Sequence, residues 1–248
     1  MTVSKSKNWI VRAAGLLFAL VLISSCFVGS TFAKYVTAAS GSDTARVAKF
    51  GVTVSASNNT MFKTAYTTDD ATAEASITNS VESADTDKLV APGTKEDGTA
   101  TFSVTGTPEV AVKVAVSLDP DSLKEVFLKA GTYADYTTAA NDDTFELAED
   151  YYPVKFTLTK NGTAVVTDGT LSDVNVKLAE VSKDYAPNTN LSEALGEYTL
   201  SWAWAFDGND RADTLLGNLA AGTATGVDTA NYSTKIAFNL KVTVTQID

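Results

Sequence analysis

Residues Glu197 to Phe206 read EYTLSWAWAF, and this stretch decides the fold class. Large apolar side chains alternate in it with Thr, Ser and Ala; they are Tyr198, Leu200, Trp202, Trp204 and Phe206. A period of two residues is typical of a β-strand with one buried face, so the stretch predicts a strand that packs its aromatic face into a β-sandwich core. We interpret Trp202 and Trp204 as core residues rather than ligand-stacking residues, because buried aromatic side chains dominate core packing.

The same alternation predicts further strands along the chain. They begin near Arg46, occur twice within Ala100–Leu118, and span Tyr151–Val166 and Lys235–Ile247. Within Tyr151–Val166 the pair Asn161-Gly162 predicts a hairpin, because Asn-Gly readily adopts the positive φ angles of a type I′ turn. Residues 55–98 are mostly Thr, Ala, Ser, Asp and Asn, and we expect only one or two short strands there.

Short helices are predicted where apolar residues recur at helical spacing beside a capping residue. These segments are Asp121–Lys129, Leu171–Ser182 and Asp210–Leu219. Seven or more alternating segments with only two or three short helices in the connections predict a mainly β fold. The expected architecture is an antiparallel β-sandwich of the jelly-roll or immunoglobulin-like kind.

The first 33 residues have the pattern of an export signal. Lys5, Lys7 and Arg12 precede an uncharged, largely apolar run that ends in small residues. A permanent transmembrane helix is the alternative, since the run approaches the length that spans a bilayer. We therefore divide the chain into a signal peptide (1–33), a leader (34–46) with no core of its own, and a single β-sandwich domain (47–248).

Two cleavage sites compete within this segment. Thr31-Phe32-Ala33 places small residues where a signal peptidase requires them and predicts a cut between Ala33 and Lys34. The stretch Leu22 to Cys26 (LISSC) resembles a bacterial lipobox, which would attach a diacylglycerol to Cys26 and anchor the protein. The first cut releases the protein, and the second tethers it to a membrane.

Composition excludes several functions. The chain has no His and only one Cys, Cys26, so it cannot form a Ser-His-Asp triad, a zinc-binding cluster of His and Cys, or an internal disulfide. We expect no enzymatic activity, because the remaining acidic pairs lie in polar, loop-like stretches. With 19 Lys+Arg against 30 Asp+Glu, the net charge of −11 argues against a nucleic-acid partner.

One acidic stretch is a weak calcium candidate. DGNDRAD places Asp207, Asn209, Asp210 and Asp213 close together, and oxygen ligands suit Ca²⁺. The spacing departs from the EF-hand pattern, with Gly at the second position and Asp at the fourth. We favour a capped turn into the helix that follows, and we expect no other cofactor.

Three quoted features together resemble a known family. A long signal ends in Thr31-Phe32-Ala33, KYVTAASGSDTARVAKFGVTV follows directly, and YTLSWAWAF precedes DTLLG late in the chain. In this order they look like the TasA/camelysin family of secreted bacterial matrix proteins, whose signal is served by a SipW-type peptidase. The resemblance is strongest over residues 1–54 and 197–217, and only architectural between them.

The resemblance implies a jelly-roll domain that a signal peptidase trims and that assembles into extracellular matrix or cell-surface fibres. The segment behind the cleavage site would insert as an extra strand into the next subunit, giving a head-to-tail homopolymer to which other matrix proteins can attach. Within the segment Lys34–Val54, the side chains expected to fill the neighbour's groove are Val47, Phe50, Val52 and Val54. The alternative in which the first strand pairs within its own domain stays open, and the two states can interconvert.

Camelysin relatives are described as metalloproteases, but that activity does not carry over to a chain without His. The leading hypothesis is thus a secreted fibre subunit. The second is a cell-surface binding module anchored through Cys26.

Overall fold

The computed structural model describes residues 14–18, 46–57, 61–68, 73–119, 123–138 and 143–247, with residues 97–99 described in backbone only. The chain divides into two compact units, Met1–Val47 and Ala48–Asp248. In the first unit residues 14–18 form a helical segment. No helix among the described residues is long and apolar enough to cross a membrane. All other elements belong to the second unit.

The larger of two facing sheets has five antiparallel strands. Their order is β1 (Val52–Ser57), β4 (Lys95–Gly106), β12 (Glu197–Trp204), β9 (Val154–Lys160) and β10 (Thr163–Gly169). The stretch quoted first therefore forms a strand, as its alternation predicts, and the strand lies at the centre of this sheet. Tyr198, Leu200, Trp202 and Trp204 are buried in the core.

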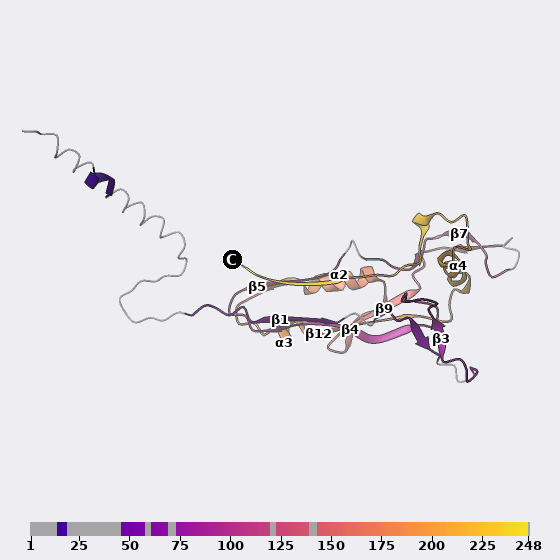
Figure 1. Cartoon of the computed structure of the whole chain (residues 1–248), viewed down its shortest axis with the longest axis horizontal. Helices are drawn as coiled ribbons and strands as arrows, with labels where there is room; N and C mark the ends of the chain where they lie inside the picture. The colour runs from indigo at the N-terminus through magenta and orange to yellow at the C-terminus, as the bar shows by residue number, and fades with distance from the viewer. Residues whose placement is uncertain are drawn as a thin grey trace, which may run out of the picture. The chain divides into compact units, whose positions relative to one another are not determined.

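The second layer combines a three-stranded sheet with a helix (Figure 1). The strands lie in the antiparallel order β11 (Lys183–Tyr185), β5 (Val112–Leu118) and β14 (Leu240–Gln246), and α2 (Leu171–Val181) lies beside β5. Asn175 Oδ1 accepts a hydrogen bond from the Leu118 N–H at 2.9 Å, and Ser182 Oγ accepts one from the Val116 N–H at 2.8 Å. Side chains of α2 and its C-cap thus occupy backbone groups that a further strand would otherwise pair.

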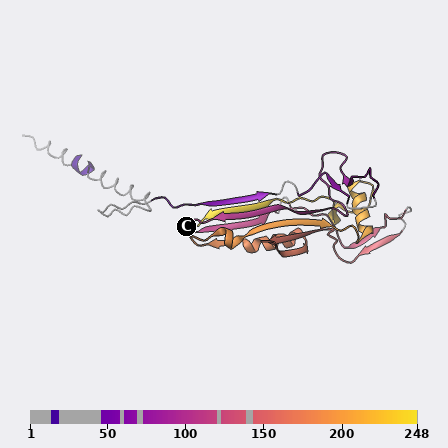
Figure 2. The same cartoon turned by 90° about the horizontal axis from the view of Figure 1, so that it is seen from below.

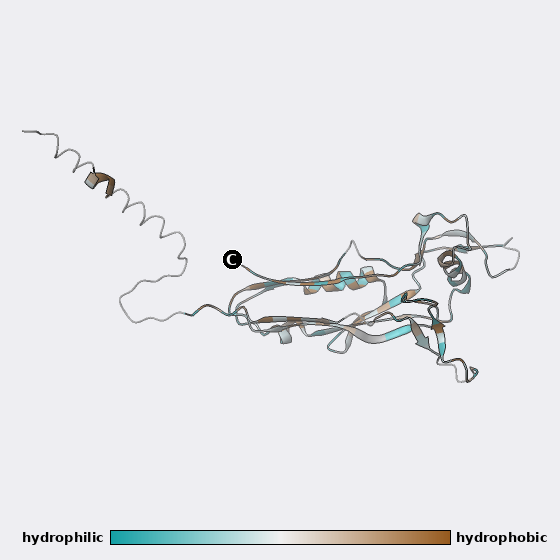
Figure 3. Cartoon of the chain, in the orientation of Figure 1, coloured by the Kyte–Doolittle hydropathy of each residue, from teal (hydrophilic) through white to brown (hydrophobic). Residues whose placement is uncertain are grey.

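The core lies between the two layers. Along α2 hydrophobic and hydrophilic residues alternate (Figure 3), and the buried ones are Leu171, Val174, Leu178 and Val181. Trp202 is 2% exposed, and its Nε1–H donates to the Met61 carbonyl at 2.8 Å. The largest core side chain therefore has its one polar group satisfied, as a buried Trp requires.

Local predictions with a strong sequence signal are confirmed. Asn161 and Gly162 have φ angles of 49° and 77° and join β9 to β10 as a hairpin. At the start of α2, Thr170 and Asp173 form a reciprocal capping box. A mainly β chain with antiparallel sheets and few helices is likewise as predicted.

The helix predicted at Asp121–Lys129 is wrong for the described residues 123–129. Lys124 forms a β-bridge with Ala237, and β6 (Phe127–Leu128) pairs with β13 (Tyr232–Ser233). Pairing with a segment more than a hundred residues away overrides the local helical spacing, because it satisfies the same backbone groups while Val126 is buried.

Three strand boundaries also differ from the prediction. The first strand begins at Val52 rather than near Arg46, and the last is regular only over Leu240–Gln246. Phe206 lies beyond the end of β12 and is 74% exposed, so its predicted place in the core is wrong. Alternation continues in the sequence past the point where the backbone leaves the sheet.

The two ends of the sandwich differ. We call the end at the Tyr198↔Lys160 pair the proximal end and the end at the Trp204↔Val154 pair the distal end. Smaller elements gather toward the distal end: β2 (Ala65–Thr67), β3 (Asn79–Glu82), β7 (Gly131–Ala134), β8 (Thr144–Leu147) and α4 (Asp210–Ala220). The connections also contain α3 (Leu191–Leu195) and η1 (Thr229–Asn231).

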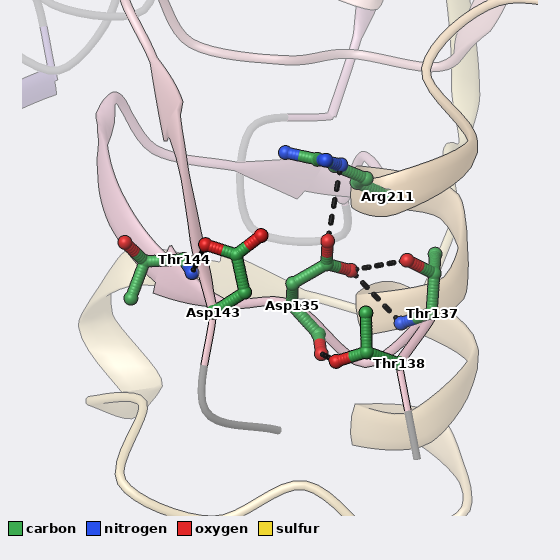
Figure 4. A network of polar contacts seen from close by, with 6 residues as sticks. All are labelled: Asp135, Thr137, Thr138, Asp143, Thr144 and Arg211. Atoms are coloured by element: carbon green, nitrogen blue, oxygen red, sulfur yellow. Dashed lines mark hydrogen bonds and ion pairs between the residues drawn. The ribbon is translucent and has the colours of Figure 1, made fainter. Parts of the chain in front are cut away.

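A buried carboxylate connects the β7–β8 hairpin to α4 (Figure 4). Asp135 Oδ1 accepts hydrogen bonds from the Thr137 N–H and hydroxyl, and Asp135 Oδ2 lies 3.1 Å from Arg211 Nε. The hydrogen bonds from Thr137 are the main cause that lowers the pKa of Asp135. The Asp135 carboxylate therefore stays ionised and pairs with Arg211 at neutral pH.

The β1–β4 pairing depends on a glycine. Gly106 has a φ of 118°, and a Cβ there would lie 2.0 Å from the Gly51 carbonyl oxygen. Gly106→Ala should destabilise the second unit by roughly 1–3 kcal/mol, because it adds backbone strain and pushes the start of β1 away from β4. Urea unfolding measures the loss, and hydrogen exchange should accelerate at the β1 amides.

Gly208→Ala is the matched control, since its added Cβ meets no heavy atom within 4 Å. Equal stability of the two variants would contradict the importance of the Gly106 close approach.

Candidate functional site

The two sides of the sandwich differ in how their edge strands are protected from pairing with another strand. On one side the β10 edge is interrupted by two register shifts, and α2 packs against both β10 and β5. Bulged edges and covering helices are the usual protection against strand addition. The other side has the edge strands β1 and β14 (Figure 2), and no register shift interrupts either pairing. We call it the open side.

The inward faces of β1 and β14 are incompletely covered. Val54 and Ala56 pair with the buried residues Val104 and Phe102, so they share the core face of the sheet, yet both are exposed. On β14, the residues opposite buried positions of β5 are only partly buried: Leu240, Val242 and Val244. Side chains that face the core are thus left partly exposed to water on this side.

Both edge strands border one apolar gap. A narrow space of about 20 Å³ lies between the layers, lined by Ser57 of β1 and Leu240 of β14 together with buried side chains such as Phe102 and Leu158. We call the gap and the inward faces of β1 and β14 the seam; its residues are Val52, Val54, Ala56, Leu240, Val242 and Val244. The seam brings together segments nearly two hundred residues apart in the sequence.

The edges of the seam are chemically suited to pair with another strand. Within the described residues β1 pairs only with β4, and β14 pairs only with β5. Neither strand contains proline, and Lys241 is their one charged residue. Regular edges with few charges, whose outer backbone groups no further strand pairs, are templates for strand addition.

The chain enters the sandwich at the proximal end. The Lys49 N–H donates to Glu109 Oε2 at 2.9 Å, and the Glu109 N–H donates to the Lys49 carbonyl at 2.9 Å. Val47, before this clamp, is 91% exposed. Residues 48–51, which precede β1, therefore lie at the proximal end, where β1 starts opposite Gly106.

The structure places the four residues predicted to act as a donated strand in two different segments. Val52 and Val54 lie in β1 and pair with β4 of their own chain, whereas Val47 and Phe50 precede the strand. The self-paired alternative is the arrangement seen in this single chain. Ala33, Lys34 and Cys26 lie outside the described residues.

Sequence reasoning did not identify β14 as part of this site. Alternation over Lys235–Ile247 predicts the strand, but it gives no sign that the apolar face of that strand stays half open. Only the strand order places β14 at an edge beside β1.

The four residues predicted as weak calcium ligands lie in different environments. Asp207 and Asp210 are exposed, whereas Asp213 Oδ1 accepts hydrogen bonds from Tyr151 Oη at 2.8 Å and from Trp204 Nε1 at 3.3 Å. The helix predicted there is confirmed as α4, but its N-cap Asn209 makes no side-chain capping bond. No group of three or more Asp or Glu suited to a metal occurs among the described residues.

Asp213 lies in a partly apolar pocket at the distal end. The pocket has a volume of about 120 Å³, and Val126, Trp204 and Leu216 are among its walls. Burial raises the pKa of Asp213, while the hydrogen bonds from Tyr151 and Trp204 oppose that shift. Burial also raises the pKa of Tyr151, which therefore acts as a hydrogen-bond donor at neutral pH.

No family model, no curated protein and no solved structure matches this chain.

The raised pKa of Asp213 predicts a pH-dependent stability difference between two variants. A carboxyl whose pKa is raised by folding costs stability while ionised and regains it as the pH falls through its folded-state pKa. Asp213→Asn keeps an oxygen acceptor without the charge, so it should equal or exceed the wild type at pH 7 by less than about 1 kcal/mol. That advantage should shrink toward pH 4 in urea unfolding.

Asp213→Ala is the contrasting variant. It leaves the Tyr151 hydroxyl and the Trp204 N–H without an acceptor and should cost about 1–3 kcal/mol at every pH. A pH-independent difference between wild type and Asp213→Asn would show that burial does not penalise the Asp213 charge.

Proposed function

We propose that this protein is a secreted structural subunit of a bacterial extracellular fibre, without enzymatic activity, whose N-terminal leader inserts as a strand into the seam of the next copy. The observation that carries the proposal is the seam, in which two unprotected edge strands border one apolar gap. Its sandwich is assigned to the jelly-roll type, in keeping with the TasA/camelysin resemblance.

The strand directions define how the leader fits. β1 runs from the proximal toward the distal end, and β14 runs in the reverse direction. A leader that extends away from the proximal end of one copy enters the next copy at its distal end. In that neighbour the inserted leader lies antiparallel to β14, which is the pairing that Leu240–Gln246 leaves free on its outer edge.

The leader has the length and composition that the seam requires. An extended strand rises about 3.3 Å per residue, so residues 34–47 reach roughly 46 Å, about twice the length of the seven-residue strand β14. Residues 35–42 read YVTAASGS, which carries no charge and mostly small side chains. Small side chains suit a narrow apolar gap better than large ones.

Cleavage after Ala33 would give the leader a free end at Lys34, so that it can extend along the seam of the next copy without a membrane anchor. This supports the released form over the Cys26-anchored form. Because leader and seam are different surfaces of one chain, the contact is heterologous and grows linearly without closing.

Deletion of Lys34–Ala48 tests the donor role. The shortened chain should remain a folded monomer, because the described core residues all follow Ala48, but it should not form fibres in electron microscopy. Added to full-length subunits, it should cap growing ends, since it keeps a seam but lacks a leader.

A leader with Thr37→Pro and Ala39→Pro is the length-matched variant, because each proline removes a backbone donor. Thr37→Ser with Ala39→Ser is its control. Fibres of normal length from the deleted chain would exclude leader donation.

A disulfide between β1 and β4 tests whether β1 itself leaves its sheet. Ser55 and Ser103 are direct partners, so Ser55→Cys with Ser103→Cys can form a cross-strand bond in a mature chain that otherwise lacks Cys. Oxidised and reduced protein should form fibres alike, as judged by sedimentation and microscopy. Fibres only under reducing conditions would mean that β1, not the leader, is exchanged.

A further inference from the structure

A lysine-rimmed pocket lies at the proximal end, on the side away from the seam. It has a volume of about 230 Å³ and combines side chains of β9, β10, α2, β11, α3 and β12. Its principal residues are Lys160, Lys177, Lys183, Tyr185, Leu195 and Tyr198. We call it the lysine pocket. It is smaller than the pockets that usually enclose a whole small-molecule ligand, and one inserted side chain suits it better.

The lysine pocket is positively charged in an acidic protein. Lys160 Nζ lies 5.7 Å from the ring centre of Tyr198, and Lys183 Nζ lies 5.3 Å from that of Tyr185. Neither lysine forms an ion pair within the described part of the chain, whereas Lys177 pairs with Glu180 at 2.8 Å. Two cations therefore remain available at the rim of an aromatic and aliphatic hollow.

A surface that complements the lysine pocket lies at the distal end of β12. We call it the knob; it consists of Phe206, Asp207 and Asp210. Phe206 follows β12, is 74% exposed, and has one side of its ring against Gly93, where an added Cβ would lie 3.1 Å from Phe206 Cδ2. Asp207 and Asp210 beside it are exposed, and the nearby Arg211 is engaged by Asp135. The loop thus presents one large apolar side chain flanked by two carboxylates.

The positions of knob and pocket match a head-to-tail contact. Eight residues of extended chain separate Tyr198 from Phe206, about 26 Å along the strand, so the knob cannot reach the pocket of its own subunit. In the fibre geometry proposed above, the proximal end of one copy faces the distal end of the next. A shift along the β12 direction brings the Phe206 loop of one copy to the lysine pocket of its neighbour.

We propose that the lysine pocket binds the Phe206 loop of a second copy of this chain. Phe206 enters the hollow lined by Tyr185, Leu195 and Tyr198, and Asp207 and Asp210 pair with Lys160 and Lys183 at the rim. An aromatic anchor in a pocket surrounded by charge pairs is the usual arrangement of an interface hot spot. The inference rests on the proposed function for the alignment of the copies, but it uses residues that the leader and seam do not.

Carbodiimide cross-linking of fibres grown from a mixture of ¹⁴N- and ¹⁵N-labelled full-length protein tests the contact. Carbodiimide joins an amine to a carboxylate in direct contact, and mass spectrometry identifies mixed-isotope peptides as intermolecular. We expect mixed-isotope links from Lys160 or Lys183 to Asp207 or Asp210. Their yield should fall about tenfold in Phe206→Ala, and it should also fall when salt is raised.

Val176→Ala is the matched control, because Val176 is also apolar and is 60% exposed on α2; it should leave the links unchanged. Lys160→Glu with Lys183→Glu should abolish assembly through this contact, and Asp207→Lys with Asp210→Lys in the same chain should restore it. Wild-type fibres that form without these links would overturn this inference and leave the seam proposal intact, whereas absence of fibres from the wild-type protein would count against both proposals. Protection of Lys160 and Lys183 by an added acidic polysaccharide, with no links between copies, would assign the pocket to a saccharide and also overturn the inference.

Discussion

The backbone N–H and C=O groups at the sheet edges are the constraint on which this structure depends. A sandwich of two open sheets has four edges, and each must be covered, distorted or left to solvent. The edge strands are β1, β10, β11 and β14. On one side β11 has only three residues, α2 contributes Asn175 and its C-cap Ser182 to the β5 backbone beyond β11, and register shifts distort β10. The same protection is missing from β1 and β14, although both could carry a bulge. The asymmetry gives the sandwich one closed and one open side, and an open side with an apolar gap is a place for strand addition.

The parts of this fold that could be predicted are those with local causes. The type I′ hairpin follows from Asn161-Gly162, the start of α2 from Thr170 and Asp173, and the central strand from period-two alternation. The segment around Val126 could not be predicted, because its strand character comes from pairing with residues 232–237. The exposed position of Phe206 could not be predicted either, since hydropathy does not show where the backbone leaves a sheet. In both cases tertiary contacts outweigh local periodicity.

Of the two parts of the candidate site, only the leader could be predicted from the sequence; the seam could not. The N-terminal leader stands out in the sequence as a polar, small-residue stretch between a predicted export signal and a strand. The acceptor that we propose for it does not stand out, because the seam exists only once β1 and β14 lie on the same side of the sandwich. Val54 and Val242 each look like ordinary residues of a half-buried strand, and only the structure shows that they lie in edge strands and stay partly exposed within the described part of the chain. The lysine pocket cannot be recognised in the sequence for the same reason, since its residues come from six elements.

In the proposed fibre, net charge gives a reason for two kinds of contact between subunits. A chain with 30 acidic and 19 basic residues repels its own copies at long range, and this repulsion keeps unassembled subunits apart despite an open edge. Main-chain pairing in the seam acts only at short range and carries little sequence information beyond side-chain size. In the contact that we propose, a local reversal of charge at the lysine pocket would offset the repulsion in one relative orientation, the one that also aligns leader and seam. Strand addition would then stabilise the joint while the charged contact selects its direction, so that an unprotected edge would lead to an ordered fibre rather than to unspecific aggregation.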